Sequence, residues 1–144
     1  MAEPAVFFVE DDAAVRKGCE QALAIADIPV RGFADGEAML AALATATPAL
    51  VVSDVRLPGK DGLTLLRELR QYDRELPVLL ITGHGDVAMA VEAMREGACD
   101  FIEKPFPSER LVAAVRSALE KRALILENRQ LKERLGSATS QIIG

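Results

Sequence analysis

Aromatic, sulfur-containing and imidazole side chains are scarce in this sequence. Its 144 residues include no tryptophan, one tyrosine, two cysteines and one histidine. Cys19 and Cys99 are far apart and form no Cys-x-x-Cys pair, so the sequence predicts neither a disulfide framework nor a structural zinc site. No apolar run approaches the roughly 18 residues of a membrane span, and the first residues lack the basic and apolar regions of a signal peptide. We therefore expect a protein of the reducing cytoplasm.

The charge balance is acidic and the apolar content is high. The formal net charge is −5, and half of the residues are hydrophobic. This apolar content is enough for a buried core and excludes disorder over the whole chain. The length fits one domain with room for an appendage. The negative charge disfavours direct binding of nucleic acid by this chain.

Five short apolar runs alternate with longer helical patterns. The runs predict strands over residues 5–9, 29–33, 50–53, 78–81 and 99–102. Three of them are almost continuously apolar, which is typical of strands buried on both faces of a parallel sheet. Asp12 is a candidate cap for the first helix, and Val87, Val91 and Met94 mark the fourth. The sequence therefore predicts an α/β fold, a (βα)5 doubly wound parallel five-stranded sheet with helices on both faces.

The last helical pattern is longer than one layer of such a fold requires. No proline or glycine occurs between Ser108 and Leu135, a length of about 40 Å as helix. Within it, Leu124, Asn128, Leu131 and Leu135 are spaced by four, three and four residues. Such a heptad seam, with an asparagine between leucines, favours a parallel homodimer in fixed register. A solvated helix with incidental leucines is the alternative.

These patterns divide the chain into three parts. We expect a compact domain over residues 1–120, a helical coiled-coil linker over residues 121–135, and the flexible start of a further linker over residues 136–144. The ending Ile-Ile-Gly is unusual for a natural C-terminus. We therefore expect the chain to be a fragment of a longer protein.

Side chains that can bind a metal ion or a phosphoryl group follow four of the predicted strands. Glu10 and Asp11 follow the first strand, Asp54 the third, Thr82 the fourth and Lys104 the fifth. The carboxyl ends of parallel strands meet at one edge of the sheet, where ligands bind. Carboxylates packed together need a cation, and a few hard oxygen ligands suit Mg²⁺. Asp54 is then the natural nucleophile for a phosphoryl group. The alternative is that these acidic residues have only structural roles, as helix caps and turn residues.

The same residues stand within longer motifs. Asp54 begins the stretch Asp-x-x-x-Pro-Gly-x-Asp-Gly, and Lys104 begins the run Lys-Pro-Phe. Together with the acidic cluster at Glu10 and with Thr82, these motifs resemble the receiver domain of two-component response regulators. The resemblance covers about residues 4–120. It implies the flavodoxin- or CheY-like strand order 2-1-3-4-5, and a regulatory phosphoacceptor rather than an enzyme.

The resemblance also implies how the acidic residues act. Asp54 is the phosphoacceptor and a metal ligand. Asp11 and the backbone carbonyl of Arg56 bind Mg²⁺ directly, and Glu10 contacts the ion through water. Mg²⁺ is thus the implied cofactor, and a sensor histidine kinase is the implied phosphoryl donor.

Further residues match the parts of a receiver that bind and report the phosphoryl group. Thr82 bonds the group, Lys104 pairs with it, and the Lys104–Pro105 peptide is expected to be cis. Phe101 matches the switch aromatic that changes rotamer with Thr82. His84, the only histidine, matches a variable position at the rim of the site that tunes dephosphorylation, rather than a base or a metal ligand.

Three further motifs, over residues 82–86, 97–106 and 127–131, narrow the resemblance. Together with the terminal Ile-Ile-Gly, they are similar to the NtrC-type regulators that activate sigma-54 RNA polymerase, and most similar to the regulators of C4-dicarboxylate transport. This implies that an AAA+ ATPase domain and a DNA-binding domain follow in the full-length protein. It also implies a homodimer, formed through the C-terminal helix and through the face of the fourth helix, fifth strand and fifth helix.

Two other functions stay open at this point. A stand-alone receiver would act by protein contacts alone, without an attached domain. A phosphatase of the haloacid dehalogenase type would also use an aspartate nucleophile with Mg²⁺. It would need a second aspartate two residues after the first, and this chain has Arg56 there.

Overall fold

The computed structural model describes residues 4–83 and 86–143, with side chains as far as Arg134. Within these residues a strand and a helix alternate five times. The elements are β1 (Val6–Val9), α1 (Ala13–Ile25), β2 (Val30–Phe33), α2 (Gly36–Ala42), β3 (Leu50–Asp54), α3 (Gly62–Tyr72), β4 (Val78–Thr82), α4 (Val87–Arg95), β5 (Asp100–Glu103) and α5 (Ser108–Ile143). The strands are parallel and lie in the order β2-β1-β3-β4-β5. The predicted fold class and strand order are confirmed.

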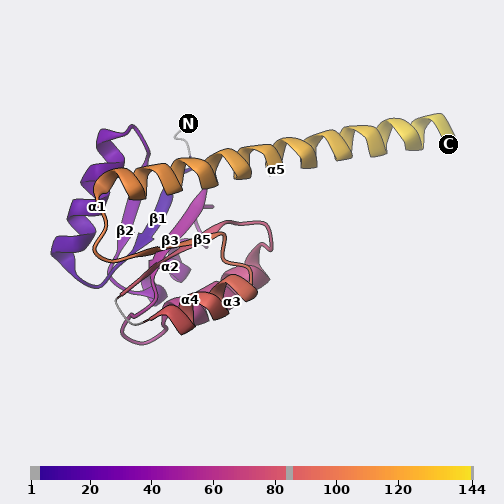
Figure 1. The fold of residues 1–144 in the computed structure, drawn as a ribbon. Coiled ribbons are helices and arrows are strands. Elements are labelled where there is room, and N and C mark those ends of the chain that lie inside the picture. The colour runs from indigo at the N-terminus through magenta and orange to yellow at the C-terminus, as the bar shows by residue number, and fades with distance from the viewer. Residues whose placement is uncertain (1–3, 84–85, 144) are drawn as a thin grey trace.

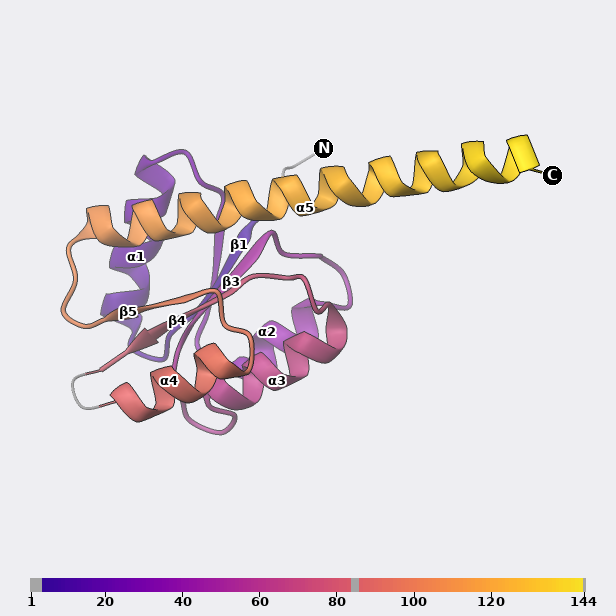
Figure 2. The same ribbon diagram turned by 45° about the vertical axis from the view of Figure 1, so that its right-hand side comes forward.

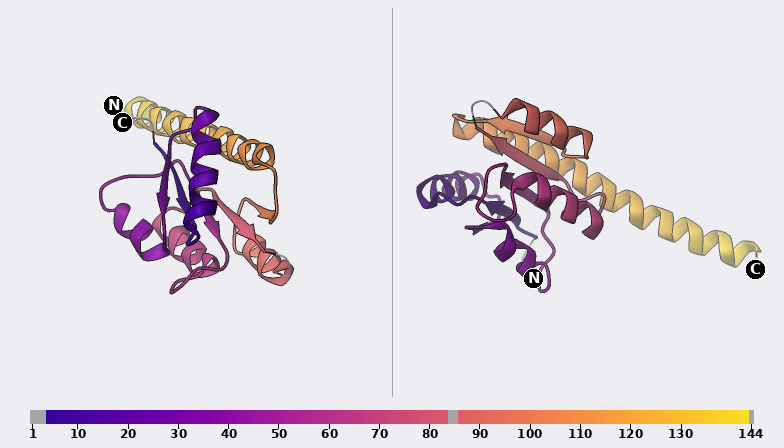
Figure 3. Two further views of the ribbon diagram at one scale, coloured as in Figure 1. Left: turned by 90° about the vertical axis from the view of Figure 1, so that its left-hand side faces the viewer. Right: turned by 90° about the horizontal axis from the view of Figure 1, so that it is seen from below.

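The sheet is buried on both faces. Successive side chains of each strand point to opposite sides, and each side is covered by helices. Phe8 of β1 belongs to the same buried cluster as Leu23 of α1 and Val115 of α5. Its neighbour Phe7 belongs to a second cluster, which contains Leu66 of α3. Figures 1 and 3 show the corresponding layers, with α1 and α5 on one side of the sheet and α2, α3 and α4 on the other. This layering explains the continuously apolar strands.

Three helices begin at an aspartate whose side chain accepts hydrogen bonds from the first turn. Asp12 accepts from two amides of α1, Asp35 accepts from α2, and Asp61 accepts from α3. Such caps stabilise a helix start by about 1 kcal/mol each. The predicted cap at Asp12 is confirmed. The caps of α1 and α3 also fix the loops that follow β1 and β3.

Helix α4 buries a different face from the one that marked it in the sequence. Val87, Val91 and Met94 are 58%, 46% and 40% exposed. The residues that face the sheet are Ala90 and Ala93, which are fully buried. The three larger side chains are apolar but lie on the outside of the helix, whereas Met89 packs partly against the same core as Ala93.

Helix α5 has 36 residues, or about 54 Å, and extends well beyond the sheet (Figure 2). The sequence predicts a flexible linker over residues 136–144. This expectation is corrected, because the helix continues to Ile143. A lone Gly136 costs a helix only about 1 kcal/mol, and no proline follows it. The division into domains stays a prediction.

Among the helices of the described residues, none combines the length and the apolar character that a membrane span requires.

Two arginines on one face of α5 tie the helix to the loop between α3 and β4. Arg122 donates a hydrogen bond of 2.8 Å to Asp73. Arg129, two turns later, donates to Asp73 at 3.0 Å and to Glu75 at 2.6 and 2.9 Å. We call these four residues the α5 clamp. Because the clamp holds α5 over two turns, the helix leaves the domain in a fixed direction.

The predicted coiled-coil seam lies on the side of α5 that faces away from the clamp. Leu124 follows Arg122 by two residues, which places it about 200° further around the helix. Leu124, Asn128 and Leu131 are all exposed, while the side chain of Leu135 lies outside the described ones. The seam is therefore accessible to a second helix, and the dimer stays a prediction.

The α5 clamp predicts a pH-dependent contribution to stability. Burial works against the charge of Asp73, but hydrogen bonds from the Glu75 amide, Arg122 and Arg129 outweigh it and lower the pKa of Asp73 below its ordinary 3.8. Stability from a lowered pKa is present above pH 3.8 and is lost as the pH falls through the folded-state value. We expect Asp73→Asn to lower the free energy of unfolding by about 2 kcal/mol at pH 7.

Urea unfolding at pH 7 and pH 3 measures this effect. The difference between Asp73→Asn and the wild type should shrink at pH 3, because this pH lies below the ordinary pKa of 3.8 and the stabilisation that the lowered pKa of Asp73 provides is already declining there. Asp27→Asn is the control, because Asp27 is exposed and is not part of the clamp; it should be neutral at both values. An equal loss for Asp73→Asn at both pH values would contradict the role given to its charge.

Candidate functional site

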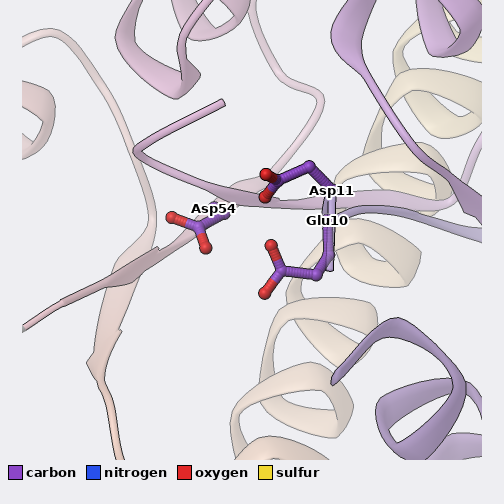
Figure 4. Close-up of side chains that lie close together, drawn as sticks. All are labelled: Glu10, Asp11 and Asp54. Atoms are coloured by element: carbon purple, nitrogen blue, oxygen red, sulfur yellow. The ribbon is translucent and has the colours of Figure 1, made fainter. Parts of the chain in front are cut away.

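Three carboxylates meet at the carboxyl ends of β1 and β3. Glu10 and Asp11 directly follow β1, and Asp54 is the last residue of β3. Each offers an oxygen, and these oxygens lie within 4.8 Å of one another. Figure 4 shows the three side chains lying close together, with Glu10 and Asp11 extending toward Asp54. Glu10 and Asp54 are buried, whereas Asp11 is exposed. The predicted acidic cluster is therefore assembled, with one side open to solvent.

Lys104 joins two of these carboxylates. Its Nζ donates to Oδ2 of Asp54 at 2.6 Å and to Oε1 of Glu10 at 2.8 Å. Burial is the main reason that the pKa of Glu10 rises from 4.5 to about 7, and the nearby Asp54 adds to it. Burial works against the charge of Lys104, but its hydrogen bonds to Asp54 and Glu10 outweigh burial and raise its pKa. The single ammonium does not fully offset the two carboxylates.

The acidic cluster fits a divalent cation. Oε2 of Glu10 is buried and has no hydrogen-bond partner, so it leaves a lone pair that a cation can satisfy. A set of carboxylate oxygens with one side open to solvent is what Mg²⁺ prefers. The backbone amide of Arg56 donates to Oδ1 of Asp54 at 2.9 Å. The part of the Arg56 carbonyl in metal binding stays a prediction.

The other residues predicted for the site follow β4 and β5. Thr82 ends β4 and is buried; its carbonyl accepts a hydrogen bond of 2.7 Å from the amide of Lys104. The Lys104–Pro105 peptide is cis, as predicted. Phe101 lies opposite Leu80 of β4, is partly buried, and packs against the core that α3 and α4 cover. His84 lies outside the described residues.

Asp86 is a residue of this region that the sequence analysis did not select. Its carboxylate accepts hydrogen bonds from Nε of Arg56 at 2.9 and 3.0 Å and from Nη2 at 2.6 Å. These bonds lower the pKa of Asp86. The pair joins the loop after β3 to the loop after β4, and Asp86 makes no side-chain cap of α4. The sequence pattern around Asp86 is that of a helix cap, and its partner is thirty residues away, so no local signal identifies the pair.

Gly62 lets α3 begin directly against the backbone that carries Asp54. The amide of Gly62 donates to the carbonyl of Val55 at 2.9 Å. A Cβ at this position would lie 2.6 Å from the carbonyl oxygen of Asp54 and 2.8 Å from Cα of Val55. Both are backbone atoms, so no side-chain rotation relieves the contact. The strand that ends at Asp54 and helix α3 are thus packed at a distance that only glycine permits.

Comparison with known proteins places this geometry in a family. The model of the response regulator receiver domain matches residues 6–116. The chain is 46% identical over 138 residues to the C4-dicarboxylate transport transcriptional regulatory protein DctD of Rhizobium meliloti, which covers 96% of this chain and 30% of that protein. It is 50% identical over 131 residues to the protein of the same name from Pseudomonas aeruginosa, covering 91% and 28%.

A solved structure shares the fold. The crystal structure of NtrX from Brucella abortus in complex with ADP superposes with a TM-score of 0.84 at 38% sequence identity, and the match covers 90% of this chain and 30% of that one. The chain therefore spans less than a third of each of these three proteins.

Proposed function

Because the chain belongs to the response regulator receiver domain family, we propose that it accepts a phosphoryl group on Asp54 from a sensor histidine kinase in the cytoplasm. Receiver domains are regulatory rather than catalytic, so the phosphoryl group is a signal here. The observation that carries the proposal is the surroundings of Asp54. Its buried carboxylate lies beside Glu10 and Asp11 and accepts a hydrogen bond from Lys104.

Asp54 supplies the nucleophile. One of its carboxylate oxygens forms a bond to phosphorus while the bond from phosphorus to the kinase imidazole nitrogen breaks, and that imidazole takes up a proton. The Arg56 amide and Lys104 each hold one oxygen of Asp54, so the carboxylate is oriented before the donor arrives. Asp11, Asp54 and the Arg56 carbonyl would hold Mg²⁺, with Glu10 in contact through water, and the ion would supply positive charge against the carboxylates and the phosphoryl oxygens.

Lys104 and Thr82 then hold the phosphoryl oxygens. Lys104 already donates to Asp54, so its ammonium can pair with the new oxygens without a large movement. Thr82 moves toward the group and donates through its hydroxyl, and Phe101 turns into the space that Thr82 leaves. This shifts a two-state equilibrium of the face formed by α4, β5 and α5, where Val87 and Val91 are exposed.

We also propose that the full-length protein is a sigma-54-dependent transcription activator of the NtrC type. The support is the identity to two transcriptional regulatory proteins of which this chain spans 28–30%. The remaining length has room for the AAA+ ATPase and DNA-binding domains that the sequence resemblance implies. In such a protein, the arrangement of the receiver dimer regulates the attached domains.

Intact-mass measurement tests the proposed phosphorylation. The purified chain is exposed to acetyl phosphate, a small phosphodonor, once with Mg²⁺ and once with EDTA. We expect one added phosphoryl group with Mg²⁺ and none with EDTA, because the carboxylates repel the donor when no cation is present. Absence of an adduct under both conditions would overturn the proposal.

The proposed homodimer predicts a sharp difference between two leucines of α5. Leu131 lies in the seam and is 47% exposed, whereas Leu126 is 41% exposed on another face of the helix. In a parallel pair, Glu127 of each helix also faces Lys132 of the other across the edge of the seam. The proposed dimer buries Leu131 of both helices, and aspartate would remove both apolar contacts. We therefore expect Leu131→Asp to raise the dimer dissociation constant at least about a hundredfold.

Sedimentation equilibrium measures the dimer dissociation constant. The matched control is Leu126→Asp, which adds the same charge to the same helix and should change the constant by no more than about threefold. Equal effects of the two substitutions would show that the predicted seam is not the interface.

A further inference from the structure

A group of cationic side chains surrounds a cleft at the amino ends of β4 and β5, the end of the sheet opposite to Asp54. One hollow of about 640 Å³ lies between the C-terminal ends of α3 and α4. A second hollow of about 290 Å³ lies between the loop before β4 and helix α5. Both hollows are lined by Arg70, Arg74 and Gly97. We call the two together the basic cleft.

The basic cleft carries uncompensated positive charge. Within the described part of the chain, Arg70, Arg74, Arg95 and Lys121 line it and have no carboxylate partner. Arg70 instead donates to the backbone carbonyl of Arg74. In a chain of net charge −5, such a concentration of unpaired cations marks a place where an anion is favoured.

The two carboxylates in the lining do not neutralise these cations, because each is already paired. Glu96 accepts two hydrogen bonds from Arg67, at 2.7 and 3.0 Å. Glu75 accepts two from Arg129, at 2.6 and 2.9 Å. The positive charge of the cleft is therefore available to a ligand.

A buried guanidinium gives a second and independent observation. Arg122 lines the inner hollow and is only 6% exposed. Its Nη2 donates to Asp73, but its Nη1 is buried with no hydrogen-bond acceptor. A buried donor on a charged group that lacks a partner has lost its water and gained nothing in exchange, which costs free energy. A ligand oxygen at this position would remove that cost.

Gly97 fixes the floor of the cleft. Its φ is +109°, and a Cβ there would lie 2.7 Å from the Cζ atom of Arg70. The guanidinium of Arg70 can therefore lie directly on the chain between α4 and β5 only because residue 97 is glycine. The cleft is a shaped feature of the fold, formed by three helices and two strand starts.

We propose that the basic cleft binds an acidic segment of a partner protein, with its carboxylates on the arginines and an apolar side chain in the inner hollow. Guanidinium groups bind carboxylates through paired hydrogen bonds, and Leu76, Pro77 and Ile125 give the inner hollow an apolar wall. The two volumes suit a few side chains. A long polyanion such as DNA would be disfavoured by the net charge of −5 of the chain. Since the cleft lies far from Asp54, this binding does not depend on the proposed phosphorylation.

A titration with a defined peptide tests the proposal. The probe is a fluorescein-labelled nine-residue peptide that repeats Glu-Glu-Leu, and the comparison peptide repeats Gln-Gln-Leu; binding is followed by anisotropy and by amide chemical shifts of the protein. We expect saturable binding of the acidic peptide only, weakened by salt. The largest shifts should fall on the amides of Gly97, Cys99 and Ile125, which lie in or beside the cleft.

Paired substitutions identify the residues that bind. Arg74→Gln with Arg95→Gln removes two exposed charges of the cleft, and we expect the dissociation constant to rise at least about tenfold. Lys17→Gln with Arg116→Gln removes two exposed charges that lie outside the cleft, one on α1 and one on the part of α5 beside α1, and should change the constant by less than about twofold. An equal effect of both pairs, binding of the glutamine peptide, or tighter binding of a short DNA duplex than of the acidic peptide would each overturn the proposal.

Discussion

Replacement of Asp54 by asparagine is expected to abolish phosphoryl uptake from acetyl phosphate in the presence of Mg²⁺. The amide oxygen of asparagine is neutral and cannot form a stable acyl phosphate, so no alternative nucleophile of the right kind remains at this position. The shape of the site should be retained. An asparagine oxygen can still accept from the Arg56 amide, and Lys104 keeps its hydrogen bond to Glu10.

The matched control is Asp12→Asn, because Asp12 directly follows the acidic cluster in the sequence but caps α1 through its side chain. Asparagine caps a helix as well as aspartate does, so this variant should take up one phosphoryl group like the wild type. The intact masses of the three proteins are compared after the same exposure. An adduct on Asp54→Asn at the wild-type level would show that another residue is the phosphoacceptor.

Gly62→Ala should have the second-largest effect, although residue 62 carries no functional group. A methyl group there would lie 2.6 Å from the Asp54 carbonyl oxygen, so either the start of α3 or the end of β3 must shift. Overpacking against rigid backbone predicts a loss of about 3 kcal/mol in the free energy of unfolding. The shift also displaces the Asp54 carboxylate, so the rate of phosphoryl uptake should fall in the fraction that remains folded.

Gly18→Ala provides the comparison for this prediction. Gly18 lies in α1, and apart from the neighbouring residues and the backbone of the helix itself, no atom lies within 4 Å of the position of an added Cβ. Alanine is the better helix former by about 0.5–1 kcal/mol, so this variant should be slightly more stable than the wild type and take up phosphoryl at the same rate. Urea unfolding and the time course of the intact mass measure both effects. If Gly62→Ala behaves like Gly18→Ala, the close approach of α3 to Asp54 does not constrain the site.

The sheet could be predicted from the sequence because its strands are buried on both faces. A short, continuously apolar run such as the one around Val52 is typical of a strand covered on both sides, and such runs located the strands to within about a residue or two. The faces of α4 were harder to predict. Val87 and Val91 are the more apolar side chains, but Ala90 and Ala93 are the ones that are fully buried, and a sequence does not show the distance between two packed elements.

The candidate site was predicted as a set of side chains but not as a set of contacts. The order of strand ends brought Glu10, Asp11 and Asp54 to one edge, since parallel strands share the edge where their carboxyl ends lie. The pairs that orient the site and the helix join distant residues. Arg56 bonds Asp86 across thirty positions, and Arg122 bonds Asp73 across forty-nine. Such pairs carry no local periodicity, so only the folded chain identifies them.

The α5 clamp fixes the rotational phase of α5 as well as its direction. A continuous α-helix turns by about 100° per residue, and Arg122 and Arg129 hold two successive turns against the loop between α3 and β4. Every residue beyond the clamp therefore has a set azimuth relative to the sheet and to Asp54. An insertion of one residue in α5 after Arg129 would turn all that follows by more than a quarter of a revolution, whereas seven residues would nearly restore it. A movement of the receiver would therefore rotate, as well as displace, a domain attached beyond this helix.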